Sequence, residues 1–143
     1  MPHREDLDST YMGTALLHAK LSKAIRAKVG AVLVTRNGVT LTGYNGTPIG
    51  NDNNCERIDP DTGELITKDS VIHAELNCIL KAAREGVSCV GATVYVTLQP
   101  CERCSAMMIN AGVQEVVYLQ DYKTQEGINL LLNSGILVRK LKE

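Results

Sequence analysis

A histidine and two cysteines are spaced so that they could hold one metal ion. Cys101 and Cys104 stand three residues apart, and His73 lies 28 residues before the first of them. One imidazole and two thiolates fill three of the four positions around a tetrahedral zinc ion. The fourth position would then be open to water, as in catalytic rather than structural zinc sites. The residue types therefore predict a catalytic zinc centre.

Glu75 lies two residues past His73, so its carboxylate is expected beside that centre. It does not have to bind the ion. Zinc with an open position activates water near neutral pH, and a general base must reach that water without needing to touch the metal. His-x-Glu followed by Pro-Cys-x-x-Cys is the pattern of zinc-dependent nucleobase deaminases. Such a site attacks the ring carbon that carries an amino group, C4 of cytosine or C6 of adenine.

Each half of the pattern is weak alone, since a Cys-x-x-Cys pair also suits structural zinc or a redox pair. The main alternative is a closed structural site with Cys78 or Cys89 as fourth ligand, which would make the chain a non-enzymatic zinc-binding module. That module would have no need for Glu75. Otherwise Cys78 and Cys89 are interpreted as core thiols, and Cys55, alone in a polar stretch, as an inert thiol.

Two predicted helices position these residues. Helical periodicity begins at Ala74 and stops at Gly86, and a second helix runs from Pro100 to Ala111. The zinc ligands therefore stand at helix starts, where the partial positive charge of the helix favours thiolates.

The other elements predict a fold of the α/β class in a single domain over residues 1–143. A first helix is expected over residues 5–27, followed by a β-hairpin (29–34 and 39–44) around Asn37-Gly38. Later strands over 92–98, 115–119 and 135–138 alternate with helices, so they should run parallel through right-handed crossovers. The result is a three-layer α/β/α sandwich on a mixed five-stranded sheet. Residues 45–72 are expected to form a long loop, either functional or a surface excursion.

The composition excludes several classes of protein. A net charge of −1 argues against a broad nucleic-acid surface. Nothing approaches the roughly 18 apolar residues of a membrane span, and the charged start Met1–Asp6 has no signal-peptide pattern. Five cysteines, an odd number, indicate reduced thiols and a cytoplasmic protein.

The chain resembles the cytidine/deoxycytidylate deaminase superfamily and, within it, the deoxycytidylate (dCMP) deaminases. The resemblance runs from Leu7 to Leu141 and rests on motifs in family order: Val29–Val32, Gly43–Pro48, His73–Asn77, Tyr95–Thr97 and Pro100–Cys104. The zinc motifs mark only the superfamily, whereas Gly43–Pro48 points to the dCMP branch. The resemblance implies a cytidine deaminase-like fold and hydrolysis of dCMP to dUMP and ammonia, a supply of precursor for dTMP synthesis.

The resemblance also implies roles for single residues. His73, Cys101 and Cys104 would bind Zn²⁺ and Glu75 would shuttle protons. Substrate would be contacted by Asn45 at the deoxyribose hydroxyl, by Arg26 at the 5′-phosphate, and by Ala74 and Tyr122. For Arg26, a solvated arginine at a helix end is the alternative. Gln99 stands where relatives often carry a small or acidic residue, which leaves the base-edge contacts there open.

Relatives in this branch are commonly homohexamers that dCTP activates and dTTP inhibits, with effector phosphates near Gly46 and Thr47. A nucleoside triphosphate at that site would bring Mg²⁺. The rival within the superfamily is a tRNA adenosine deaminase. The net charge of −1 disfavours a grip on folded RNA, and the chain ends after its last predicted strand, where that branch usually continues into a further helix.

Overall fold

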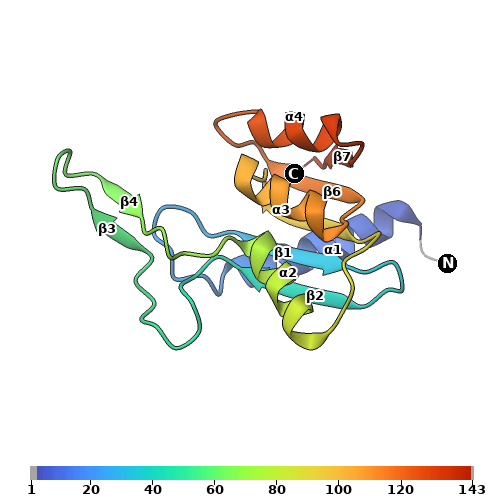
Figure 1. The fold of residues 1–143 in the computed structure, drawn as a ribbon, viewed down its shortest axis with the longest axis horizontal. Coiled ribbons are helices and arrows are strands. Elements are labelled where there is room, and N and C mark those ends of the chain that lie inside the picture. The colour runs from blue at the N-terminus through green and yellow to red at the C-terminus, as the bar shows by residue number, and fades with distance from the viewer. Residues whose placement is uncertain (1–2, 143) are drawn as a thin grey trace.

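A five-stranded mixed sheet separates two layers of helices in the computed structural model, which describes residues 3–142 (Figure 1). The order across the sheet is β2 (Thr40–Tyr44), β1 (Gly30–Val34), β5 (Thr93–Leu98), β6 (Glu115–Gln120) and β7 (Leu137–Lys140). Strand β1 is antiparallel to both of its neighbours, whereas β5, β6 and β7 are parallel to one another. The predicted sandwich and its parallel half are confirmed.

The two faces of the sheet carry different helices because successive strand side chains point to opposite sides. Val32, Tyr95 and Val117 pack with Met12 and Ala15 of α1 (Arg4–Ala19). Their neighbours along the strands face a larger core on the other side. That core is covered by α2 (Ala74–Glu85), α3 (Glu102–Ala111) and α4 (Glu126–Asn133). No helix within residues 3–142 has the length and apolar character to cross a membrane.

The first helix ends at Ala19, so the prediction that it runs to residue 27 was wrong. Strand β1 begins so close to the helix that a Cβ on Gly30 would lie 1.9 Å from the Ala15 carbonyl oxygen. Beyond the helix, side chains take the place of helical carbonyls. The Ala24 N–H donates to Ser22 Oγ at 3.2 Å, and the next two N–H groups donate to the carboxylate of Glu56.

A small β-hairpin interrupts the predicted loop over residues 45–72. Strands β3 (Glu56–Ile58) and β4 (Leu65–Thr67) pair antiparallel and form a separate two-stranded sheet. Their turn includes Gly63 at φ +73°, a conformation that glycine adopts without strain. Figure 1 shows this hairpin extending away from the main sheet. Three-residue strands without an apolar alternation carry no periodic signal, so the sequence did not predict them.

Candidate metal centre and active site

The three predicted zinc ligands meet where two helices begin. His73 is the N-cap of α2 and Cys101 the N-cap of α3. His73 Nδ1 lies 3.2 Å from Cys104 Sγ and 3.6 Å from Cys101 Sγ. A tetrahedral zinc ion holds nitrogen and sulfur ligands about 3.6 Å apart and two sulfurs about 3.8 Å apart. All three ligand atoms lie within 4.8 Å of one another, so the donor set fits zinc with small side-chain adjustments.

The charge state of this cluster suits a cation. The hydrogen bond from the Cys104 thiol, together with His73 and the Cys104 N–H, lowers the pKa of Cys101 to about 3. The pKa of Cys104 is raised because that thiol donates to Cys101 and is buried. A metal ion held by both sulfurs would take the place of the proton in this hydrogen bond.

Glu75 lies in the first turn of α2, and only 3% of its surface is exposed. Burial raises the pKa of its carboxyl, and neighbouring His73 opposes that shift. A carboxyl whose pKa moves toward neutrality can both accept and return a proton, which is what a shuttle must do.

The cysteines proposed as a fourth ligand lie elsewhere. Cys78 Sγ is 3.6 Å from the carbonyl oxygens of Ala31 and Leu41 in the core, where burial raises its pKa to about 12. Cys89 is buried in the same core. Within residues 3–142, His73, Cys101 and Cys104 form the only group of three or more His, Cys, Asp or Glu side chains close enough to share a metal. The closed structural site is therefore not supported.

Cys55 is buried, and burial raises the pKa of its thiol. Its Sγ lies 3.7 Å from the Asn53 carbonyl oxygen. This environment fits the inert thiol that was predicted.

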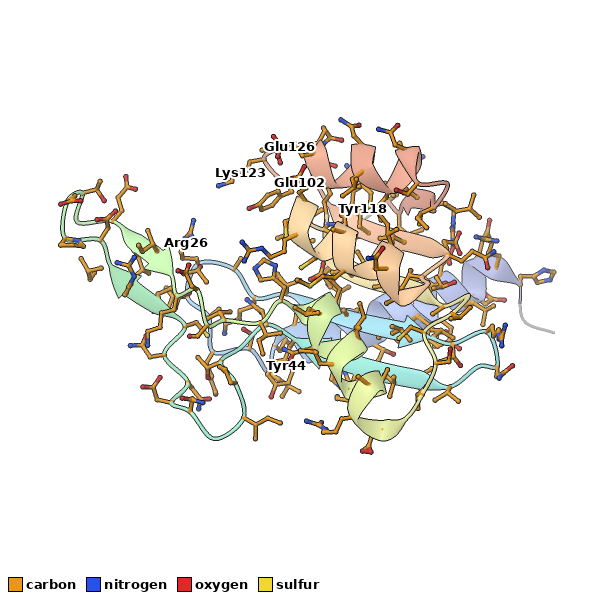
Figure 2. The ribbon with its side chains drawn as sticks, in the orientation of Figure 1. Arg26, Tyr44, Glu102, Tyr118, Lys123 and Glu126 are labelled. Carbon is orange, nitrogen blue, oxygen red and sulfur yellow. The ribbon has the colours of Figure 1, made fainter. Side chains whose placement is uncertain are left out.

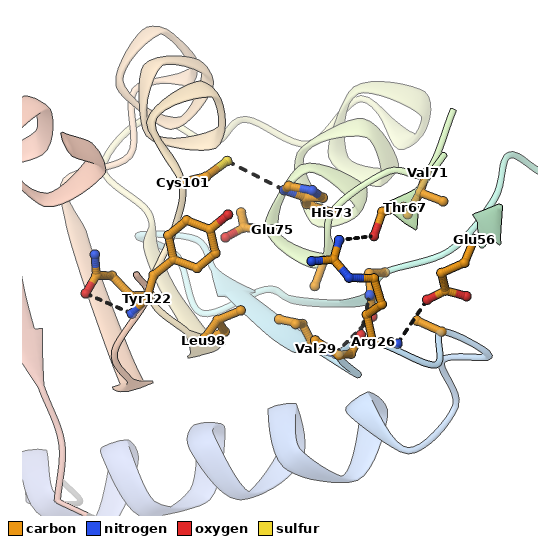
Figure 3. A pocket seen from close by; sticks show the side chains of 15 residues that line it. Arg26, Val29, Glu56, Thr67, Val71, His73, Glu75, Leu98, Cys101 and Tyr122 are labelled. Carbon is orange, nitrogen blue, oxygen red and sulfur yellow. Dashed lines mark hydrogen bonds between the residues drawn. The ribbon is translucent and has the colours of Figure 1, made fainter. Parts of the chain in front are cut away.

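A cavity of about 210 Å³ opens beside the ligands (Figure 3). His73, Glu75 and Cys101 line it together with Ala74 of α2. Tyr122, from the loop after β6, extends its ring across the cavity toward Glu75. The predicted catalytic residue, two of the predicted metal ligands, Ala74 and Tyr122 therefore line one cavity.

Asn45 and Arg26 line the same cavity. The Asn45 side chain donates from Nδ2 to the Ala27 carbonyl at 2.8 Å, and its Oδ1 accepts from the Val29 N–H at 2.9 Å. Asn45 thus ties the end of β2 to the loop after α1, and one Nδ2 hydrogen is left over for a ligand. Arg26 is exposed, but it lies in the loop after α1 and not at a helix end. Figure 2 shows it between that loop and the β3–β4 hairpin.

Three cavity residues were missed as functional candidates: Glu56, Thr67 and Gln99. Gln99 is 2% exposed, donates to the Thr124 carbonyl at 2.7 Å and accepts from the Tyr122 N–H at 3.3 Å. It therefore holds the loop that carries Tyr122, a role that its departure from the family pattern only hinted at. Glu56 and Thr67 come from the unpredicted hairpin, and no sequence signal indicated them.

Gly46 and Thr47 lie apart from this cavity, in a hollow of about 330 Å³. Its lining includes Tyr44 and two cationic side chains, Lys81 and Arg84. The N–H and carbonyl of Gly46 pair with the backbone of Ile72, at 3.1 and 2.8 Å. The Gly46 N–H is therefore already bonded within the backbone.

Comparisons with known proteins agree with this site. Residues 5–120 match the family model described as "Cytidine and deoxycytidylate deaminase zinc-binding region". The deoxycytidylate deaminase of Enterobacteria phage T4 is 34% identical, over 91% of this chain and 87% of the phage protein. That of Saccharomyces cerevisiae is 37% identical over 96% of this chain, which spans only 45% of the yeast protein.

A solved structure is also similar over nearly the whole chain. It is the dCMP deaminase from the cyanophage S-TIM5, determined in complex with dCMP and dUMP. The TM-score is 0.86 at 37% identity, and the match covers 98% of this chain and 100% of the other.

Proposed function

The chain belongs to the cytidine and deoxycytidylate deaminase family, and we propose that it hydrolyses dCMP to dUMP and ammonia. One observation carries the proposal. A single cavity is lined by Glu75 and zinc-ligand residues and also by an arginine, Arg26, that can bind a phosphate. A nucleoside monophosphate needs both features at once.

The chemistry follows from where Glu75 lies. Zinc held by His73, Cys101 and Cys104 would supply Lewis-acid activation of a water molecule near neutral pH. Glu75 takes a proton from that water and places it on N3 of the cytosine ring as the water oxygen bonds to C4. Glu75 then delivers the second proton to the amino group, the C4–N bond breaks and ammonia leaves. One water is consumed, and no oxidant or reductant is needed.

The remaining cavity residues account for the choice of substrate. Arg26 offers a planar guanidinium with several donors, which suits a phosphate group. The free Nδ2 hydrogen of Asn45 is directed to the deoxyribose hydroxyl, and Tyr122 covers the base. Ala74, with its small side chain, leaves room for the ring.

Purified protein is expected to convert dCMP to dUMP, and removal of zinc by a chelator should lower the rate by at least about 100-fold because water activation is lost. The loss of cytosine absorbance measures turnover, and added Zn²⁺ should restore it. The control substrate is a tRNA anticodon stem-loop. Formation of inosine there, without turnover of dCMP, would contradict the proposal.

We also propose that dCTP activates and dTTP inhibits the enzyme at the hollow beside Gly46 and Thr47. Lys81 and Arg84 supply positive charge there for a triphosphate, which would bind as its Mg²⁺ complex. Saturation curves for dCMP should shift to lower concentration with dCTP and to higher concentration with dTTP. Curves that stay superimposed would contradict this regulation.

The same proposal includes a homohexamer in the cytoplasm. Leu17, Leu21 and Ile25, in and just after α1, are 63%, 53% and 73% exposed, which suits a surface between copies. None of the five cysteines, all within residues 3–142, forms a disulfide, as expected in a reducing compartment. Light scattering of the purified protein measures the number of copies.

A further inference from the structure

We propose that the β3–β4 hairpin is the element that positions Arg26 for the phosphate of the substrate, with Glu56 and Thr67 as positioning residues. The proposal rests on the proposed function, in which Arg26 binds the 5′-phosphate of dCMP. It adds what holds the arginine in place. Neither Glu56 nor Thr67 needs to touch the reacting atoms.

Glu56 holds the backbone of Arg26. Its Oε2 accepts from the N–H groups of Ile25 and Arg26, at 2.8 and 3.0 Å. These N–H groups belong to the segment that follows the end of α1, where no helical carbonyl is available to them. The carboxylate is 3% exposed, so these charge-assisted bonds are shielded from water.

Within the residues that the structure describes, the Glu56 side chain makes no hydrogen bonds other than these two. Its second oxygen, Oε1, is buried and has no hydrogen-bond partner among them. Burying a carboxylate with one oxygen unpaired costs free energy. The two hydrogen bonds to the N–H groups of residues 25 and 26 are therefore the interactions that offset this cost.

Thr67 holds the side chain of Arg26. The guanidinium donates from Nη1 to Thr67 Oγ1 at 3.2 Å, on the side of the cavity that Figure 3 shows. Arginine has five N–H donors, so this bond leaves donors for a phosphate. The contact orients the guanidinium and uses only one of its donors.

The two contacts come from one place on the hairpin. Glu56 and Thr67 are directly opposite each other in the antiparallel register of β3 and β4. Opposite residues in such a pair project to the same face. One cross-strand pair therefore accepts hydrogen bonds from both the main chain and the side chain of the same arginine.

The expected consequence is selective. An exposed arginine that is free to rotate must be ordered when the phosphate binds, which weakens binding. Loss of the hydrogen bonds to Arg26 should therefore raise KM for dCMP and leave kcat unchanged, because Glu75 and the metal ligands are untouched. Deoxycytidine lacks the phosphate, so its turnover should not change.

The test uses two variants, Thr67→Val and Glu56→Ala, in the full chain. Thr67→Val removes one hydroxyl at constant shape and should raise KM for dCMP about threefold. Glu56→Ala leaves two N–H groups without their acceptor and should raise it at least about tenfold. For deoxycytidine, kcat/KM should stay within about twofold in both variants, as the phosphate-specific role requires.

The conservative variant and a matched control sharpen the result. Glu56→Gln keeps an acceptor oxygen, so its KM for dCMP should lie between wild type and Glu56→Ala. Glu64→Gln makes the same change at an exposed position of the same hairpin and should have no effect. Should Glu56→Ala fail to fold, Thr67→Val still decides the matter.

Coupling to Arg26 separates positioning from simple stability. In an Arg26→Ala background, Thr67→Val should raise KM for dCMP no further, because there is no guanidinium left to orient. Equal losses with dCMP and deoxycytidine, an unchanged KM for dCMP in Thr67→Val, or a full effect in the Arg26→Ala background would overturn the proposal. A wild-type protein that fails to convert dCMP would instead remove the proposed function itself.

Discussion

Replacing Glu75 with glutamine is expected to lower kcat for dCMP by at least about 10³-fold. Glutamine keeps the shape of the side chain but can no longer carry a proton from water to the ring and then to the departing amine. In the proposed mechanism every proton transfer passes through this one carboxyl, which is buried, so the loss should lie toward the upper end of the effect of a single general acid–base group. Absorbance at the cytosine band measures the rate.

Zinc content and folding separate this role from a structural one. Since Glu75 is outside the group of metal-ligating side chains, the Glu75→Gln variant should retain wild-type zinc and an unchanged circular dichroism spectrum. Glu85→Gln, at the exposed opposite end of α2, is the matched control and should keep full activity. Substantial activity in Glu75→Gln would refute the shuttle.

Replacing Arg139 with methionine is expected to lower the free energy of unfolding by about 3 kcal/mol. Arg139 of β7 donates two hydrogen bonds to Asp8 of α1, at 2.8 and 2.9 Å, and a third to Glu115 of β6 at 2.8 Å. Both carboxylates are buried. Tyr95 and Arg4 provide the partners that would remain. Methionine fills the volume but leaves the two negative charges without their shared cation.

The pH dependence of this stability difference tests whether the Arg139–Asp8 ion pair causes it. The Arg139 guanidinium holds the pKa of Asp8 below its ordinary value of 3.8, against the opposing effect of burial. The stabilisation is therefore fully present above about pH 4 and is lost as pH falls through the lower pKa of the folded state. The difference between wild type and Arg139→Met should narrow below pH 4.

Urea unfolding followed by circular dichroism at neutral and acidic pH measures this difference. The control is Asp121→Asn, which breaks a pair with Lys140 in which the Asp121 side chain is 59% exposed. That change should cost about 0.5 kcal/mol or less. A similar loss in both variants at neutral pH would contradict the role assigned to the buried network.

Local patterns in the sequence predicted the metal centre and most of the sheet. Cys101 and Cys104 are neighbours in one helical turn, and Glu75 follows His73 by two residues, so short-range geometry already determines much of their arrangement. The Asn37-Gly38 turn similarly predicted the β1–β2 hairpin, and Gly38 adopts φ +87° there. Alternation of strands and helices then determined the parallel half of the sheet.

The group of metal-ligating side chains could thus be predicted from the sequence alone, whereas the part of the cavity lined by Arg26, Glu56 and Thr67 was decided only by the tertiary structure. Arg26 was expected in a helix, yet its N–H donates to Glu56, 30 residues away, and its guanidinium to Thr67, 41 residues away. A backbone N–H bonds to whichever acceptor the folded chain brings within reach, and a carboxylate from a distant hairpin can replace a helical carbonyl. Neither hydrophobic periodicity nor a sequence motif indicates which acceptor such an N–H group will find in the folded chain. The site predicted around His73, Cys101 and Cys104 is therefore completed by a hairpin that the sequence did not predict.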